Sequence, residues 1–111
     1  MRYFPAFTDL DGRACLVVGG GETAARKVRL LRRARASVVV VAHSLTPELA
    51  ELAAAGHVTH HRRAFRGGDV LDKALVIAGS ECAGVDERVA GIARAANVPV
   101  NAVDRPAARP L

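Results

Sequence analysis

The fold of this chain is decided by the stretch Leu16-Val17-Val18-Gly19-Gly20-Gly21-Glu22-Thr23-Ala24. An apolar run over residues 14–18 stops at three consecutive glycines, which predicts a buried strand followed by a tight turn. Apolar residues then recur at the i, i+4 and i+7 spacing of one helical face, at Ala24, Val28 and Leu31. The stretch therefore predicts a strand, a glycine turn and a helix over about residues 22–35.

The three glycines and Ala24 match the pattern G-x-G-x-x-G/A, which is typical of turns that bind the diphosphate of a dinucleotide. Gly19 permits the sharp turn, Gly21 lets the backbone approach a diphosphate, and Ala24 keeps the helix close to the strand. Free amides and the positive end of the helix dipole would bind the phosphate charge. We therefore predict a dinucleotide site at Gly19, Gly20 and Gly21. The alternative is a glycine turn that binds no ligand.

The rest of the chain repeats this alternation of strand and helix. Further strands are predicted over residues 37–41, 58–60, 74–78 and 98–103, with helices over residues 46–56 and 83–96 and a loop with one helical turn over residues 62–72. Strands joined by helical crossovers are parallel, and right-handed crossovers place helices on both faces of the sheet.

The predicted fold class is therefore α/β, a Rossmann-type, doubly wound parallel sheet. We expect five strands in the order 3-2-1-4-5, within a three-layer α/β/α sandwich. The expected organisation is one dinucleotide-binding domain over residues 1–104. A tail over residues 105–111 contains Pro106 and Pro110, which cannot extend regular structure.

The second strand ends at Val41-Ala42-His43-Ser44, without the carboxylate that commonly accepts the ribose hydroxyls of NAD. Ser44 could bond such a hydroxyl and His43 could lie beside the adenine, or both are ordinary loop residues. Without a carboxylate a 2′-phosphate is not repelled, so these residues leave NAD and NADP both open.

Two more strand ends would meet a ligand at the same edge of the sheet. Gly79 and Ser80 follow the fourth strand, where small residues leave room for the nicotinamide half. Asn101 and Asp104 belong to the end of the fifth strand, and we count Asn101 with the cofactor-binding candidates. The carboxylate of Asp104 could act as a general base or bind a metal, or it could cap the following turn.

Composition narrows the classes of partner. The chain has 111 residues, of which 50% are hydrophobic, as expected for a globular domain, and its formal net charge of +5 could attract nucleic acid, an anionic membrane or an acidic small molecule. The arginines of the first predicted helix form a solvated face. Because only 4% of residues are aromatic, base stacking on nucleic acid is not expected.

Cysteine and histidine usage points to a reducing cytoplasm and to no recognised metal site. The two cysteines form no CxxC pair, and the four histidines lack ligand spacing; we expect His60 and His61 to be surface residues. No apolar run approaches the roughly 20 residues that span a bilayer, so we expect a soluble protein with no membrane partner.

Three stretches resemble siroheme synthase, in its amino-terminal precorrin-2 dehydrogenase and sirohydrochlorin ferrochelatase module. They are residues 3–7 (Tyr-Phe-Pro-Ala-Phe), residues 16–27, in which GGG-E-x-A-x-R-K is more specific than the glycines alone, and residues 101–104 (Asn-Ala-Val-Asp). The resemblance covers residues 3–104. The fourth strand departs from it, because it ends Gly79-Ser80-Glu81-Cys82 where the family usually has an Ala-Thr-Asp type of sequence.

The resemblance implies an enzyme of siroheme biosynthesis: an NAD-dependent oxidoreductase that converts precorrin-2 to sirohydrochlorin. In many members insertion of ferrous iron follows. It favours NAD over NADP and implies contacts to the cofactor from Glu22 and Thr23 after the third glycine and from His43 and Ser44. It also implies that Asp104 acts in both dehydrogenation and chelation, that the basic charge meets a polycarboxylate tetrapyrrole, and that the protein is a homodimer.

Two rival functions belong to other classes. The first is an NAD-binding regulatory or sensor domain without catalysis, which would bind NAD but form no NADH with precorrin-2. The second is a basic nucleic-acid-binding domain, which would associate with DNA in a salt-sensitive manner and show no nucleotide affinity.

Overall fold

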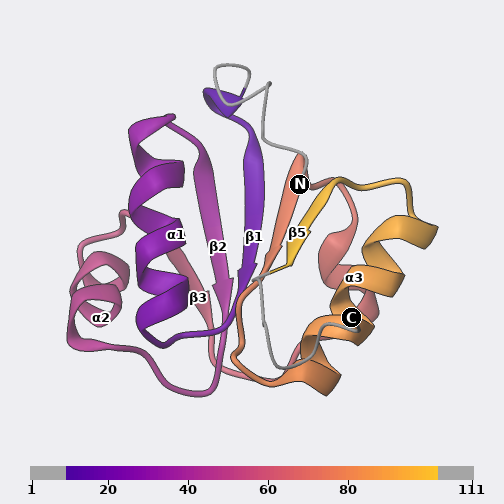
Figure 1. Ribbon diagram of the computed structural model, residues 1–111. Helices are drawn as coiled ribbons and strands as arrows, with labels where there is room; N and C mark the ends of the chain where they lie inside the picture. The colour runs from indigo at the N-terminus through magenta and orange to yellow at the C-terminus, as the bar shows by residue number, and fades with distance from the viewer. Residues whose placement is uncertain (1–9, 103–111) are drawn as a thin grey trace.

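A computed structural model describes residues 10–102 of the chain. Five parallel strands form one sheet in the order β3-β2-β1-β4-β5, with α1, α2 and α3 packed around it (Figure 1). The predicted fold class and strand order are confirmed. The elements are β1 (Ala14–Val18), α1 (Glu22–Arg33), β2 (Ser37–Val41), α2 (Pro47–Ala54), β3 (Thr59–His61), the 3₁₀ turn η2 (Gly67–Val70), β4 (Leu75–Ala78), α3 (Ala83–Ala95) and β5 (Val100–Ala102).

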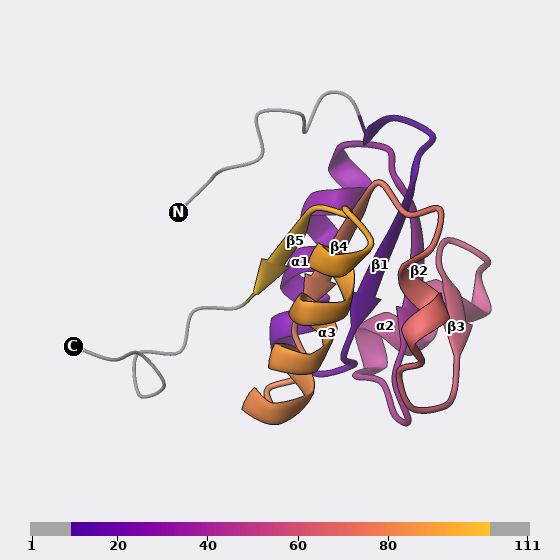
Figure 2. The ribbon, with the colours of Figure 1, turned by 90° about the vertical axis from the view of Figure 1, so that its right-hand side faces the viewer.

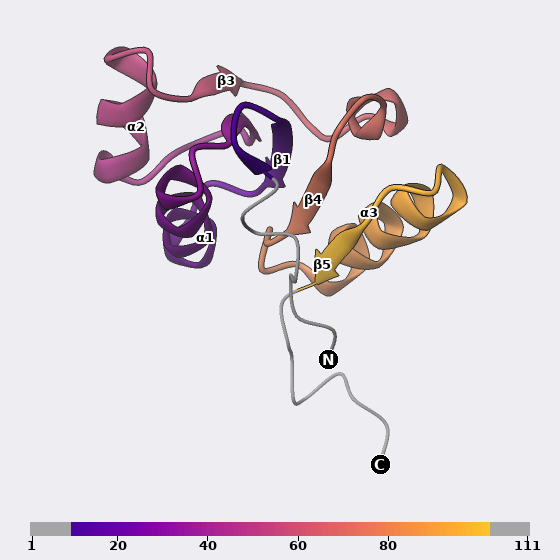
Figure 3. The same cartoon turned by 90° about the horizontal axis from the view of Figure 1, so that it is seen from above.

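The sheet is covered on both faces because alternate strand residues point to opposite sides. Cys15 and Val17 of β1 belong to the core cluster that includes Val28 of α1. Leu16 and Val18 belong to the other cluster, with Val89 of α3. Seen from above, α1 and α2 lie on one side of the sheet and α3 on the other (Figure 3). In Figure 2 the sheet is seen from the side of α3, which lies in front of the strands, with α1 behind them.

Local chemistry accounts for the element ends. Thr46 caps α2 by accepting a hydrogen bond from the amide of Leu49 at 3.2 Å, and Pro47 takes the first helical position. The first helix ends two residues earlier than predicted because Arg35 takes a left-handed conformation, with φ of 65°.

The last strand is shorter than predicted at its start. Asn97 is left-handed, with φ of 60°, and the amide of Val98 still bonds the carbonyl of Ala93 in α3 at 2.8 Å. The strand therefore begins only at Val100. Asp104, the tail over residues 105–111 and the motif over residues 3–7 lie outside the described residues.

Candidate dinucleotide site

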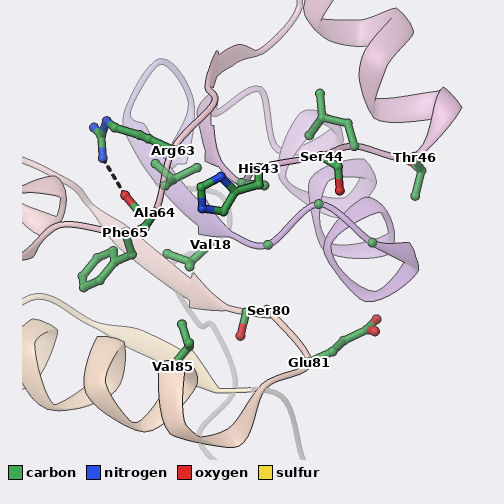
Figure 4. Close-up of a pocket in the computed structure, with 16 residues that line it drawn as sticks. Val18, His43, Ser44, Thr46, Arg63, Ala64, Phe65, Ser80, Glu81 and Val85 are labelled. Atoms are coloured by element: carbon green, nitrogen blue, oxygen red, sulfur yellow. Dashed lines mark hydrogen bonds between the residues drawn. The ribbon is translucent and has the colours of Figure 1, made fainter.

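A cleft of about 610 Å³ lies at the carboxyl edge of the sheet, where the chain leaves β1, β2, β3 and β4 (Figure 4). This is the edge at which open α/β sheets bind ligands, and the volume falls within the range of cofactor sites. Its lining comprises Val18, Gly19, Gly20, Gly21, Val41, Ala42, His43, Ser44, Leu45, Thr46, Arg63, Ala64, Phe65, Ser80, Glu81 and Val85.

The glycine turn after β1 is wedged between the turns after β2 and β4. Gly19 has φ of 130°, and a Cβ added there would overlap the carbonyl of Gly79. A Cβ on Gly20 would overlap the carbonyl oxygen of Ser44 in the same way. Backbone hydrogen bonds join the three turns. The amide of Gly79 donates to the carbonyl of Val18 at 3.0 Å, and the amide of Thr46 donates to the carbonyl of Gly20 at 2.9 Å. Gly19 and Gly20 therefore let the three turns meet.

Gly21 has a different environment. The three atoms nearest to a Cβ added there would all belong to the carboxylate of Glu81, with Oε2 at 3.4 Å. Gly21 is also the N-cap residue of α1 and supplies no side-chain cap. The open side of this glycine and the start of the helix thus form the cradle that a dinucleotide diphosphate requires.

The turn after β2 presents His43 and Ser44, both exposed, to the cleft. Behind them His60 is half-buried, and its Nε2 lies 2.8 Å from the carbonyl oxygen of Ala42. The expectation that both adjacent histidines are surface residues is therefore right for His61 and wrong for His60, because the β3 register brings His60 against this turn.

The turn after β4 is organised by Asp86, a residue of α3 that is only 4% exposed. Its Oδ1 accepts hydrogen bonds from the amide of Ser80 at 3.0 Å and from the hydroxyl of Ser80 at 2.7 Å. The hydroxyl in turn accepts from the amide of Cys82 at 3.1 Å. Sequence reasoning missed Asp86; the available signal was an acidic residue in the first turn of the helix that follows a serine turn.

The segment after β3 forms the wall that sequence reasoning treated only as a polar loop. Arg63 donates to both carboxylate oxygens of Asp69, at 2.9 and 2.8 Å. The Arg63 guanidinium lowers the pKa of Asp69, chiefly through this hydrogen bond, and the amide of Arg66 adds a further bond at 2.8 Å. Phe65 is buried beneath this wall, with the guanidinium of Arg88 5.4 Å from its ring centre.

Most predicted cofactor residues gather at this cleft. Its lining includes Gly19, Gly20, Gly21, His43, Ser44 and Ser80. Glu22 and Thr23 form the first turn of α1, and Gly79 lies against Gly19. Asn101 on β5 is outside the lining, and its Oδ1 is buried with no hydrogen-bond partner among residues 10–102. Cofactor contact by these residues stays a prediction, and Asp104 cannot be placed because it lies outside residues 10–102.

Other predictions concern metal, cysteine and charge. Within residues 10–102 no group of three potential metal ligands occurs. Both cysteines are free: Cys15 is buried, which raises the pKa of its thiol, and Cys82 is exposed. The arginines of α1 are exposed as predicted, and Arg29 pairs with Glu48 of α2 at 2.8 Å. In the described part of the chain, no helix has both the length and the apolar character to cross a membrane.

The fold and the glycine cradle define a Rossmann-type nucleotide-binding domain, and comparison with known proteins agrees. Residues 6–109 match the family model described as "Putative NAD(P)-binding". The chain belongs to this NAD(P)-binding family, and NAD is the cofactor that the comparisons support.

Similar proteins include enzymes named for siroheme synthesis or precorrin-2 oxidation. The chain is 46% identical over 106 residues to the siroheme synthase of Thioalkalivibrio sulfidiphilus and 45% identical over 107 residues to that of Nitrosomonas europaea. Each match covers 96% of this chain and 22% of the relative, so the chain spans about a fifth of the length of these proteins. The solved structure of SirC, a precorrin-2 dehydrogenase, matches with a TM-score of 0.73 and 25% identity over 92% of this chain and 48% of that one. The resemblance to siroheme synthase is confirmed.

Proposed function

We propose that this chain is an NAD-dependent dehydrogenase module that oxidises precorrin-2 to sirohydrochlorin in siroheme biosynthesis. The observation that carries the proposal is the cradle at Gly21, open to a cleft of about 610 Å³, in a chain similar to siroheme synthases and to the precorrin-2 dehydrogenase SirC. The cradle supports dinucleotide binding, and the relatives' names supply the substrate.

The oxidation removes two electrons and two protons from the substrate; NAD, when bound, would supply the hydride acceptor, and one proton would be released. In our proposal the amides at the start of α1 bind the diphosphate, while His43 and Ser44 lie on the adenosine side. Ser80, held by Asp86, would border the nicotinamide side. We propose Asp104 as the base that takes the proton, because it follows β5 closely in the sequence and a carboxylate can act as a general base.

The partners follow from the same proposal. A tetrapyrrole polycarboxylate would be attracted by a chain with a net charge of +5. Ferrous iron as a second substrate, a homodimeric assembly and a cytoplasmic setting without nucleic-acid or membrane partners complete the proposal. The free thiols of Cys15 and Cys82 are consistent with a reducing compartment.

The test is anaerobic incubation of the purified chain with precorrin-2 and NAD, followed by NADH absorbance, with calorimetry of NAD, NADP and the tetrapyrrole in parallel. We expect NAD binding and one NADH per precorrin-2 consumed. NAD binding without NADH would favour the regulatory or sensor function. Salt-sensitive DNA binding without nucleotide affinity would favour the nucleic-acid function.

The Asp104→Asn variant tests the base. It should bind NAD as the unmodified chain does and lose turnover by at least roughly 100-fold, the typical contribution of a positioned base. Unchanged turnover in this variant would remove Asp104 from the mechanism while leaving the cofactor site intact.

A further inference from the structure

A carboxylate of the protein lies at the start of α1, where the proposed diphosphate would bind. Oε2 of Glu81 accepts a hydrogen bond from the backbone amide of Thr23 at 3.4 Å, across 58 positions of sequence. The same carboxylate is the nearest group to the open side of Gly21. The Glu81 side chain extends from the turn after β4 toward the start of α1 (Figure 4). Glu81 thus accepts a hydrogen bond from the first turn of α1 and faces the open side of Gly21.

A diphosphate and this carboxylate cannot use the cradle together. The first amides of a helix have no partner within the helix, and the helix dipole adds a partial positive charge, so both anions are attracted to the same point. With both present, like charges would lie within a few ångströms of each other in a partly desolvated cleft, which is unfavourable.

We propose that Glu81 is an intramolecular competitor for the diphosphate. In the free protein its carboxylate takes the amide of Thr23, and dinucleotide binding displaces it. Glu81 therefore sets the affinity of the site for diphosphate-containing ligands. This inference rests on the proposed function only in taking the dinucleotide as the ligand of the cleft.

The geometry makes the carboxylate easy to displace. A distance of 3.4 Å is longer than the 2.7–3.2 Å of ordinary N–H···O bonds, so the contact is weak. Glu81 is exposed, so the side chain can rotate from the helix into solvent.

The backbone, in contrast, directs the side chain toward the helix. Glu81 has φ of 67°, a left-handed conformation that is unfavourable for a residue with a side chain. The turn that holds it there is anchored by the bonds between Ser80 and Asp86. Displacement therefore requires rotation of one side chain, without movement of the turn.

The experiment compares Glu81→Gln with the unmodified chain by calorimetry, using NAD, ADP and adenosine as ligands. The glutamine keeps the length of the side chain and removes its charge. We expect NAD and ADP to bind roughly two- to fivefold more tightly, the effect of one charge near a helix terminus. Adenosine, which carries no phosphate, should bind with unchanged affinity. A Glu81→Ala variant, which removes the competing group altogether, should show at least the same gain.

The matched control is Glu87→Gln. Glu87 is an exposed glutamate of α3 outside the cleft lining, so this variant makes the same change in net charge. Its affinity for all three ligands should equal that of the unmodified chain. Equal gains in Glu81→Gln and Glu87→Gln would reduce the effect to net charge and overturn the inference.

The remaining outcomes separate this inference from the proposed function. Unchanged or weaker NAD binding in Glu81→Gln, or a gain shared by adenosine, overturns the competitor role even if NADH is formed from precorrin-2. The expected gain without any NADH supports the competitor role and contradicts the dehydrogenase. No binding of NAD or ADP to any variant overturns both.

Discussion

The turns after β1 and β4 lie side by side at the carboxyl edge of the sheet, and they are held by different interactions. The first is positioned by contact between backbones, since Gly19 and Gly20 leave no room for a Cβ against Gly79 and Ser44. The second is positioned by side chains, through the bonds of Ser80 to Asp86. The turn after β1 therefore depends on glycines that lack a Cβ, and the turn after β4 depends on the buried carboxylate of Asp86.

This difference suggests that the two turns contribute to the site in different ways. A turn defined by steric exclusion tolerates almost no substitution and gives the site its form. A turn defined by polar side chains can present different groups to the cleft, as this one presents Glu81. Variants of Gly20, Asp86 and Gly21 test this comparison, and a variant of Asp69 tests the neighbouring segment after β3.

The largest effect is expected for Gly20→Ala. Its Cβ would overlap the carbonyl oxygen of Ser44 and crowd Ala42. The backbone can relieve this overlap only if the turn after β1 moves away from the turn after β2. We expect a loss of about 3 kcal/mol in the free energy of unfolding, measured by urea titration. The matched control is Gly91→Ala in α3, where an added Cβ would meet nothing within 4 Å among residues 10–102 outside its own helix; this variant should gain about 0.5–1 kcal/mol.

The next effect is expected for Asp86→Ala. The amide and hydroxyl of Ser80 lose their acceptor, which should lower the free energy of unfolding by about 1–3 kcal/mol. Asp86→Asn keeps an acceptor oxygen and should lose clearly less. Equal losses in the two variants would show that these hydrogen bonds do not hold the turn.

A smaller, pH-dependent effect is expected for Asp69→Asn. Arg63 lowers the pKa of Asp69 in the folded protein below its ordinary value of 3.8, so the unfolded chain binds this proton more tightly. The resulting stability is present above the ordinary pKa and disappears as the pH falls through the folded value. The variant should therefore be less stable at neutral pH, by no more than about 1 kcal/mol, and the difference should shrink below about pH 4. A difference that stays constant down to acid pH would contradict this coupling.

The smallest effect on stability is expected for Gly21→Ala. Its φ is −91°, and the nearest group to the new Cβ is a mobile carboxylate, so the free energy of unfolding should change by less than about 0.5 kcal/mol. NAD affinity should nevertheless fall by roughly tenfold or more, because the methyl group enters the diphosphate cradle. Urea unfolding would test the small change in stability, and calorimetry on the same sample would test the loss of NAD affinity. A large loss of stability would refute the contrast with Gly20.

Much of the fold was predictable because its signals are local. The apolar run before Gly19, the spacing of Ala24, Val28 and Leu31, and the Thr46-Pro47 start of α2 each express a preference within a few neighbouring residues. The β1–α1 cradle was predictable for the same reason, since strand, glycines and helix are contiguous. Element ends were less predictable, because Arg35 and Asn97 end helices in left-handed conformations that side chains rarely adopt.

The rest of the site depends on residues that are distant in sequence. The pairs Thr23–Glu81 and Ala42–His60 join segments that are far apart in the sequence, and the local sequence around one partner does not predict the other. Arg63 and Asp69 are near in sequence, but only the 3₁₀ turn between them directs both side chains to one wall.

By itself the sequence determined the α/β class, the strand order and the position of the dinucleotide cradle, because hydrophobic periodicity and glycine conformations act over short stretches. Only the tertiary structure decided which side chains face that cradle, including the Glu81 carboxylate at the start of α1. The physical reason is that parallel strands place the ends of distant segments at one edge, where contacts depend on register and turn geometry.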